Sequence, residues 1–290
     1  MTSNIIYICI SINITRRIIM NVKQKKIKPI LRWAGGKHWL IERISHYLPS
    51  EFLNYHEPFV GGASIFINLN LKKKAYISDS NSELICFYKQ VKENPEKLIF
   101  KIKELTNSEE EFYKIRNHTP KTDIDIATRF YYLNKTCFNG IYRVNQKGIF
   151  NVPYGRRNID ILDIEGIQML SIKLQKTSIR CVDFQKALSF AKAGDFVFLD
   201  PPYTVAHNKN GFIEYNQKIF SWEDQERLAL CVRELIKRKI FFIMTNANHE
   251  SLLKLYKNVG KQFEVERFST MSGHINSRIK VSELIITNCI

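Results

Sequence analysis

The sequence predicts an α/β fold, in which a sheet domain is interrupted by a mostly helical insertion. Phe196–Leu199 is an unbroken apolar run, bounded by Asp195 and by two prolines, and such a run is typical of a buried strand. Residues 55–79 read as strand, glycine turn, helix, strand and acid, the outline of a nucleotide-type binding unit. Helical patterns replace strand patterns between about residues 81 and 176, and this change predicts the insertion.

The first predicted element follows a glycine-containing segment. Residues 32–37 read R-W-A-G-G-K, and a lysine-rich stretch at residues 23–28 precedes them. Apolar residues then recur at helical spacing from Trp39 to Leu48, and Pro49 ends the pattern. These residues therefore predict one helix.

The nucleotide-type unit begins after this helix. Residues 55–60 predict a strand that leads into a glycine turn at residues 61–62, and an apolar helix follows over residues 65–69. A second strand over residues 75–78 ends at Asp79. Because glycine has no Cβ, the turn lets the backbone pass close to a ligand.

The insertion has helical patterns over residues 83–105, 108–116 and 126–133. A polar stretch over residues 134–155 follows, and its glycines fit hairpin turns that could enter a groove of a nucleic acid. A solvated basic loop is the alternative interpretation of this stretch.

Strand patterns resume after the insertion. Short strands are predicted over residues 178–181, 196–199, 240–244 and 283–287. Ser221 is positioned to cap a helix that runs to about Arg238, with Asp224 three residues on as its partner in a capping box.

The tetrapeptide after the 196–199 strand, Asp200, Pro201, Pro202 and Tyr203, suits a flat substrate that carries an amine. In open α/β sheets, ligands gather beyond the carboxyl ends of the strands. There Asp200 can accept a hydrogen bond from the amine, and Tyr203 can stack on the ring. The prolines have no N–H and a fixed φ, so they hold the carbonyls between them as further acceptors. An ordinary strand-ending turn is the alternative for this tetrapeptide taken alone.

The composition favours a polyanionic partner. The 290 residues include 44 Lys and Arg against 28 Asp and Glu, a net charge of +16, and a polyanion releases counterions when such a protein binds it. A solvated, lysine-rich surface is the alternative. The 44% hydrophobic content argues against global disorder. The cysteines form no C-x-x-C pair and there is no H-E-x-x-H, so we expect a cytoplasmic protein with reduced thiols and no metal.

Residues 1–28 are expected to form a loosely ordered extension. Their apolar stretch at residues 5–10 is too short to span a bilayer, and no basic residue precedes it. Met20 is an alternative start of the functional chain, and an amphipathic membrane anchor is an alternative role for the extension.

Several separated motifs then occur in a fixed order: R-W-A-G-G-K, P-F-V-G-G-A-S, S-D-S-N, a block from L-N-K-T-C-F-N-G to N-V-P-Y-G, and D-P-P-Y. Over roughly residues 29–290 this set resembles the Dam-type DNA adenine-N6 methyltransferases, the D12 class. The resemblance implies a Rossmann-like S-adenosylmethionine-dependent methyltransferase domain formed by residues 29–81 and 177–290. It also implies that residues 82–176 are a target-recognition insertion that binds DNA.

The resemblance further implies which residues bind the methyl donor. They are Trp33, Lys37, Phe59, Gly61, Gly62, Asp79 and Asp200. Asp79 lies 18 residues after Gly61, near the roughly 20-residue offset at which a carboxylate meets ribose hydroxyls in dinucleotide folds. The alternatives are a turn residue for Asp79 and a plain core aromatic for Trp33. Ala63 stands where the family has a third glycine, and we expect donor binding to survive this change.

A P-loop reading of the G-G-K sequence at residues 35–37 is excluded. Leu31 occupies the position of the required first glycine, and His38 stands where Ser or Thr would be needed.

The activity that the resemblance implies is methyl transfer from S-adenosylmethionine to N6 of an adenine flipped out of a specific double-stranded DNA site. Asp200, Pro201, Pro202 and Tyr203 are the predicted catalytic residues. Hydrogen bonds from the amine to Asp200 and to a carbonyl of the proline pair would localise the nitrogen lone pair. The donor supplies its own leaving group, so no metal is needed.

The insertion is expected to contact the DNA. The predicted contact residues are Lys135, Asn139, Tyr142, Arg143, Asn145 and Lys147. Arg143 is the predicted base contact. We expect a monomer that does not bind membranes, acting alone or paired with a restriction endonuclease. Two alternatives remain open: a related methyltransferase that acts on RNA or protein, and a catalytically silent DNA-binding homologue.

Overall fold

The structure is a computed structural model that describes residues 27–145, 147–204, 220–268 and 280–290. The predicted N-terminal extension, apart from its last two residues, and Met20 lie outside the described residues. In the described part of the chain, no helix has both the length and the apolar character needed to cross a membrane.

Within the described residues, seven strands form one sheet in the order β3-β2-β1-β4-β5-β7-β6. The strands are β1 Tyr55–Glu57, β2 Ala75–Asp79, β3 Thr177–Cys181, β4 Phe196–Leu199, β5 Phe241–Ala247, β6 Lys261–Phe268 and β7 Lys280–Thr287. The first five are parallel, whereas β7 runs antiparallel to both of its neighbours. The order reverses between β1 and β4, so the loops after these two strands flank the crevice in which such sheets bind ligands.

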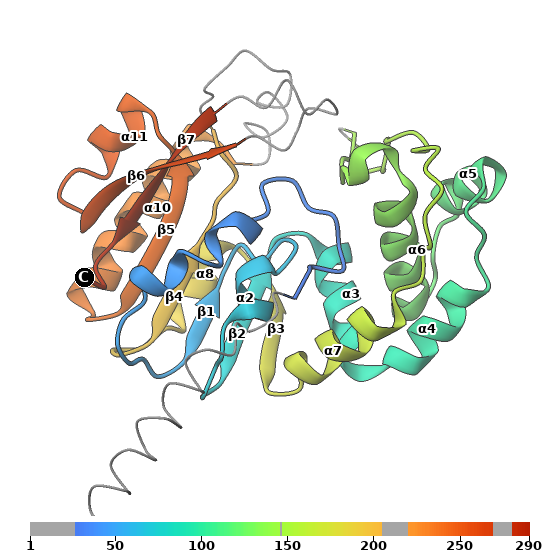
Figure 1. Ribbon diagram of the computed structural model, residues 1–290, viewed down its shortest axis with the longest axis horizontal. Helices are drawn as coiled ribbons and strands as arrows, with labels where there is room; N and C mark the ends of the chain where they lie inside the picture. Colours follow the sequence, from blue (N-terminus) through green and yellow to red (C-terminus); the bar gives the residue numbers. More distant parts are fainter. Residues whose placement is uncertain (1–26, 146, 205–219, 269–279) are drawn as a thin grey trace, which may run out of the picture.

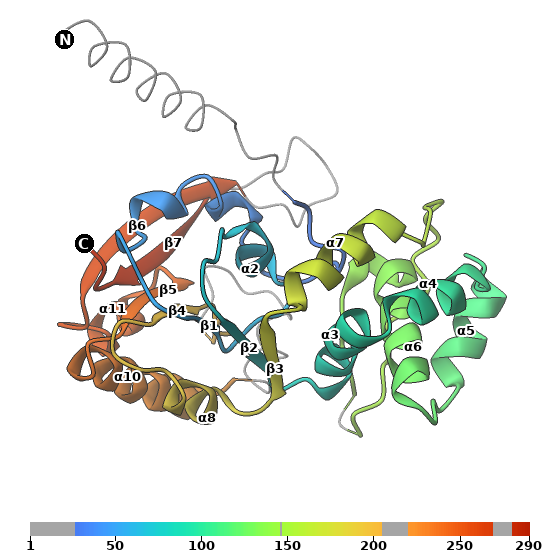
Figure 2. The ribbon, with the colours of Figure 1, turned by 90° about the horizontal axis from the view of Figure 1, so that it is seen from below.

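Helices cover both faces of the sheet (Figure 2). On one face lie α8 Phe184–Ser189, α10 Trp222–Lys237 and α11 Glu250–Leu255, and on the other lies α2 Ser64–Asn68. The central strand β4 is buried on both sides, because Phe196 and Phe198 belong to one hydrophobic cluster and Val197 and Leu199 to the other. This explains its unbroken apolar sequence.

The insertion between β2 and β3 is helical, as predicted, and lies beside the sheet (Figure 1). Its helices are α3 Ser82–Glu93, α4 Pro95–Lys103, α5 Glu109–Asn117, α6 Asp123–Thr136 and α7 Ile164–Leu174. The single helix predicted over residues 83–105 is in fact two, because Pro95 has no N–H to continue α3 and instead occupies the first turn of α4.

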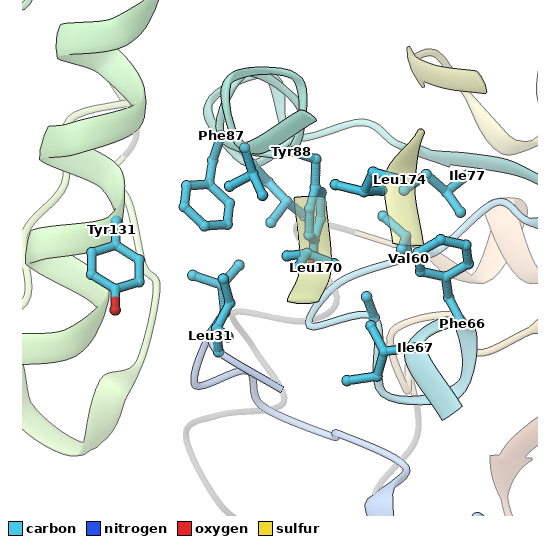
Figure 3. Packing of buried hydrophobic residues seen from close by; sticks show 14 of the residues in the cluster. Leu31, Val60, Phe66, Ile67, Ile77, Phe87, Tyr88, Tyr131, Leu170 and Leu174 are labelled. Atoms are coloured by element: carbon cyan, nitrogen blue, oxygen red, sulfur yellow. The ribbon is translucent and has the colours of Figure 1, made fainter. Parts of the chain in front are cut away.

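The insertion shares one hydrophobic core with the adjacent face of the sheet. Figure 3 shows Leu31 from the N-terminal segment near Tyr88 of α3 and Leu170 of α7, with Val60 and Phe66 close by. The insertion therefore packs on the sheet domain through apolar side chains.

Two further sequence predictions are decided by the structure. The helix predicted from Trp39 to Leu48 is wrong: two short 3-10 helices, η1 His38–Leu40 and η2 Ile44–His46, replace it. Neither has a side-chain N-cap, although the periodic Leu40 and Ile44 are buried as expected. The helix capped by Ser221 is confirmed as α10, with the complete capping box to Asp224.

Candidate active site

Asp200 lies at the carboxyl end of β4, and two side chains hold one of its oxygens. Lys37 Nζ is 2.8 Å from Asp200 Oδ1, and the Thr245 hydroxyl, from β5, donates to the same oxygen at 2.7 Å. Neither of these two contacts involves the other carboxylate oxygen, Oδ2. The carboxylate is therefore fixed through one oxygen, and the other is available to an amine.

The charge state of Asp200 depends on Lys37. Burial raises the pKa of Asp200 above its ordinary value, whereas the Lys37 ammonium and the hydrogen bond from Thr245 act to lower it. Lys37 is itself buried, and its Nζ also donates to the Gly35 carbonyl at 2.7 Å. The R-W-A-G-G-K segment thus carries the cation that favours an ionised Asp200.

Tyr203 is fixed by a residue that the sequence motifs do not contain. Its hydroxyl donates to Glu283 Oε2 at 2.8 Å, and Lys37 Nζ lies 5.0 Å from the centroid of its ring. Glu283 comes from β7 and is buried, and its Oε2 is 3.9 Å from Lys37 Nζ. Sequence reasoning missed both Glu283 and Thr245. The signal for Glu283 was a carboxylate directly before the apolar run of residues 284–286 in a predicted strand.

The glycine turn after β1 is held by Asp79. The Gly61 N–H donates to Asp79 Oδ2 at 3.1 Å, and the Asn81 N–H donates to Oδ1 at 3.0 Å. A Cβ added at Gly61 would lie 2.7 Å from the Trp33 indole, so only glycine permits this approach. The structure thus brings together the three segments predicted to bind the donor, around residues 33–37, 61 and 79.

Ala63 has a left-handed backbone, with φ 58° and ψ 26°. This is the region that glycine favours, which accounts physically for a third glycine at this position in the family pattern. The Ala63 side chain is nevertheless buried, and the loop runs directly into α2. The alanine therefore keeps the backbone turn at the cost of local strain.

An acidic residue beneath the turn was also missed by sequence reasoning. Glu57, the last residue of β1, is buried, and its Oε2 accepts a hydrogen bond from the Tyr55 hydroxyl at 2.7 Å. Burial, together with the nearby carboxylates of Asp200 and Asp79, raises the pKa of Glu57 to about 8.

An aromatic cluster lies beyond the carboxyl ends of β1 and β3. The ring of Phe59 is 5.5 Å from that of Phe184 and 5.6 Å from that of Phe220. Phe59 was predicted to bind the donor, whereas Phe184 and Phe220 were not. Phe184 follows a predicted strand closely, and that position was the available signal.

The insertion is attached directly to the R-W-A-G-G-K segment. Asn134 of α6 donates to the Arg32 carbonyl at 2.7 Å and accepts from the Arg32 N–H at 2.9 Å. The Tyr142 ring stacks on Trp33 with centroids 5.9 Å apart, and its hydroxyl donates to Glu83 at 2.9 Å. Trp33 is thus in contact with both the glycine turn and the insertion.

The predicted DNA-contacting residues fall into two groups. Asn139, Arg143, Asn145 and Lys147 are exposed. The Arg143 Nε donates to Asn151 Oδ1 at 3.0 Å, and Asn145 Oδ1 accepts from the Lys147 and Ile149 N–H groups. Tyr142 and Lys135 are half-buried, and Lys135 Nζ lies 5.4 Å from the Tyr131 centroid.

Comparison with known proteins adds independent evidence. Residues 33–271 match the family described as D12 class N6 adenine-specific DNA methyltransferase. The chain is 37% identical over 283 residues to the type II methyltransferase M1.LlaDCHI of Lactococcus lactis subsp. cremoris, covering 93% of this chain and 99% of that protein. It is 36% identical over 288 residues to the type II methyltransferase M.MjaIII of Methanocaldococcus jannaschii, covering 91% of this chain and 99% of that protein. It is 32% identical over 269 residues to a DNA adenine methylase of Serratia marcescens, covering 90% of this chain and 98% of that protein.

Proposed function

Because the chain belongs to the D12 class of N6 adenine-specific DNA methyltransferases, and so methylates adenine in DNA, we propose that the target amine is held at Asp200. One observation carries the proposal: Lys37 and Thr245 both engage Oδ1 of Asp200. A carboxylate fixed through one oxygen presents the other in a defined direction, which is what orienting an amine requires.

S-adenosylmethionine is the donor that the family implies, and the chemistry of the site suits it. With Asp200 and Glu283 ionised, the two carboxylates exceed the single positive charge of Lys37, which favours a cationic ligand. The cluster of Phe59, Phe184 and Phe220 offers apolar faces for an aromatic ring. When bound, the donor supplies an electrophilic methyl group on a sulfonium. The residues proposed to hold it are Trp33, Lys37, Phe59, Gly61, Gly62, Asp79 and Asp200.

The chain's own residues then activate the nitrogen. Asp200 Oδ2 and a carbonyl of the Pro201-Pro202 pair accept hydrogen bonds from the amine, so that its lone pair is withdrawn from the ring and becomes nucleophilic. The same acceptors stabilise the positive charge that develops on N6. Tyr203 stacks on the adenine, which has to leave the duplex to reach these groups.

The DNA is proposed to lie across the insertion and the open side of the active site. Asn139, Arg143, Asn145 and Lys147 are the exposed side chains for this contact, and the half-buried Lys135 and Tyr142 are proposed to complete it. The net charge of +16 supplies the non-specific attraction to phosphates. We further propose that the enzyme is a site-specific DNA-methyltransferase that acts on double-stranded DNA as a monomer. Two of its relatives are named as type II methyltransferases, which supports pairing with a restriction endonuclease.

The test is methyl transfer by the Asp200→Ala variant. Protein is incubated with genomic DNA and labelled donor, incorporation is counted, and modified adenines are mapped by sequencing. We expect Asp200→Ala to abolish incorporation while DNA binding persists, and Asp200→Asn, which keeps one carbonyl oxygen, to retain part of the activity. Near-normal incorporation by Asp200→Ala would refute the role of this residue. Label in RNA or protein instead of DNA would refute the proposed substrate.

A further inference from the structure

Glu283 is a buried carboxylate that reaches the candidate active site from the C-terminal end of the chain. Its side chain is 1% exposed, and β7 places it opposite Ala247 at the end of β5. Removing a carboxylate from water is costly unless hydrogen-bonding or charged partners compensate. The partners of Glu283 are therefore informative about its role.

Tyr203 and Lys37 are two of those partners among the described residues. The Tyr203 hydroxyl donates to Glu283 Oε2 at 2.8 Å, and Lys37 Nζ is 3.9 Å from the same oxygen. Lys37 in turn lies 2.8 Å from Asp200 Oδ1 and 5.0 Å from the centroid of the Tyr203 ring. Glu283 thus connects the proposed stacking ring to the cation that holds the proposed amine acceptor.

The geometry explains why such a connection is needed. The Tyr203 ring is half-buried, and one part of it packs against the apolar cluster on the α8, α10 and α11 side of the sheet. A hydrogen bond at the hydroxyl, the point farthest from the backbone, restricts rotation of the ring about its side-chain bonds. The acceptor is charged and inaccessible to bulk water, which makes the bond stronger than one between neutral groups.

We propose that Glu283 is a positioning residue for methyl transfer, which orients the Tyr203 ring through its hydroxyl so that the ring forms one wall of the site for the target base. This inference rests on the proposed function, since it takes Tyr203 as the stacking ring. Glu283 touches neither the base nor the donor in this role, and its effect on the reaction passes through Tyr203.

The experiment removes the Tyr203–Glu283 hydrogen bond from each side. Single-turnover methyl transfer is measured for Glu283→Ala, Tyr203→Phe and the double variant, on a duplex whose target site was mapped with the wild-type enzyme. Each single change is expected to slow transfer by about 10- to 100-fold, the range for a hydrogen bond to a charged group. The double variant is expected to be no slower than the slower single variant, because both changes remove the same bond.

Glu283→Gln supplies the rescue, since its amide oxygen can still accept from the Tyr203 hydroxyl. We expect it to recover most of the rate that Glu283→Ala loses. Glu264→Ala is the matched control, because Glu264 is an exposed carboxylate on the neighbouring strand β6, and its side chain accepts a hydrogen bond from the Ser282 hydroxyl. It is expected to transfer methyl groups at the wild-type rate.

A spectroscopic readout separates orientation from general damage. With 2-aminopurine in place of the target adenine, wild-type enzyme is expected to raise the emission by flipping the base, and Glu283→Ala to raise it further because the ring stacks less well. Three results would each overturn the inference. They are emission at the wild-type level in Glu283→Ala, additive losses of the methyl-transfer rate in the double variant, and a Glu283→Gln variant as slow as Glu283→Ala. If Glu283→Ala does not fold, a wild-type rate for Tyr203→Phe overturns it instead.

The outcome remains distinguishable from failure of the proposed function. Full activity of Asp200→Ala, or no rise in emission with the wild-type enzyme, removes the proposed base site itself. If Asp200→Ala loses activity while Glu283→Ala and Tyr203→Phe are both fully active, only the positioning role of Glu283 is refuted.

Discussion

Lys37 Nζ lies 2.8 Å from Asp200 Oδ1, which joins the first glycine-containing segment of the chain to the end of strand β4. The two residues belong to motifs far apart in the sequence. Their contact joins the proposed donor-binding segment to the proposed amine acceptor, and it leads to the first prediction.

Replacing Lys37 should move the acid limb of the methylation rate to higher pH. Burial already raises the pKa of Asp200, and Lys37 opposes that effect, so Lys37→Met should raise the pKa further. More Asp200 is then protonated at a given pH, and activity that needs the carboxylate is lost earlier as the pH falls. The measurement is kcat against pH at saturating donor and DNA.

Thr245→Val is the matched comparison, because it removes the other group on the same oxygen without removing a charge. It should shift the acid limb in the same direction by less. An acid limb unchanged in both variants would show that Asp200 ionisation does not limit the rate.

Glu57→Gln should stabilise the protein at alkaline pH. The pKa of Glu57 is raised from 4.5 to about 8, so between these values the folded state holds a proton that the unfolded state has released. Stability from this group is therefore full at low pH and declines as the pH rises towards 8. At about 1.4 kcal/mol per pKa unit, the loss is on the order of a few kcal/mol.

Urea denaturation at pH 5 and pH 8.5 checks this. Glu57→Gln should gain stability over wild type at the higher pH and little at the lower. Glu51→Gln, at an exposed carboxylate, is the control and should follow the wild-type curve. Parallel curves for Glu57→Gln and wild type would contradict the prediction.

Ala63→Gly should change little, although it restores the glycine of the family pattern. Relief of the left-handed backbone gains about 1–2 kcal/mol. The loss of a buried methyl group costs roughly 0.8 kcal/mol, and the greater freedom of the unfolded chain costs about 0.4–1 kcal/mol. These effects nearly cancel, so the free energy of unfolding should stay within about 1 kcal/mol of wild type.

Calorimetry with S-adenosylmethionine checks the function of the same loop. Wild type and Ala63→Gly should bind the donor with Kd values within about threefold, a difference of less than 1 kcal/mol. Ala63→Val should weaken both stability and binding, because a β-branched residue is strongly disfavoured at positive φ. Donor affinity that appears only in Ala63→Gly would favour a catalytically silent wild-type protein.

Arg143→Ala should relax the choice of DNA site. The side chain is exposed, and its Nε is bonded to Asn151, which leaves the guanidinium's terminal nitrogens to meet a base edge. Loss of a base contact should cost about 1–3 kcal/mol at the cognate site. Modified-base sequencing of genomic DNA measures the effect.

Lys147→Ala is the control for a contact to phosphate. It should weaken binding about equally at all sequences and reduce the dependence of affinity on salt. A methylation pattern unchanged by Arg143→Ala would count against a base contact from that residue.

Local patterns were sufficient for the elements whose signals lie within a few residues. The all-apolar sequence of β4 follows from burial on both faces, and the Ser221–Asp224 capping box fixed the start of α10. Periodicity alone misassigned residues 39–48, because buried residues at helical spacing also suit two separate turns. It also failed to place the break at Pro95, although the proline itself was the signal.

The sequence by itself determined the reaction chemistry, because the ordered motifs and the residue types of Asp200 and Tyr203 are local properties of the chain. Only the tertiary structure decided which groups surround them. Glu283 reaches the site on β7 and Thr245 on β5, and the pairing of these strands depends on long-range hydrogen bonds that no short segment encodes. Buried charges take their partners from whatever the fold brings within a few ångströms, so the environment of a carboxylate is a property of the packed molecule.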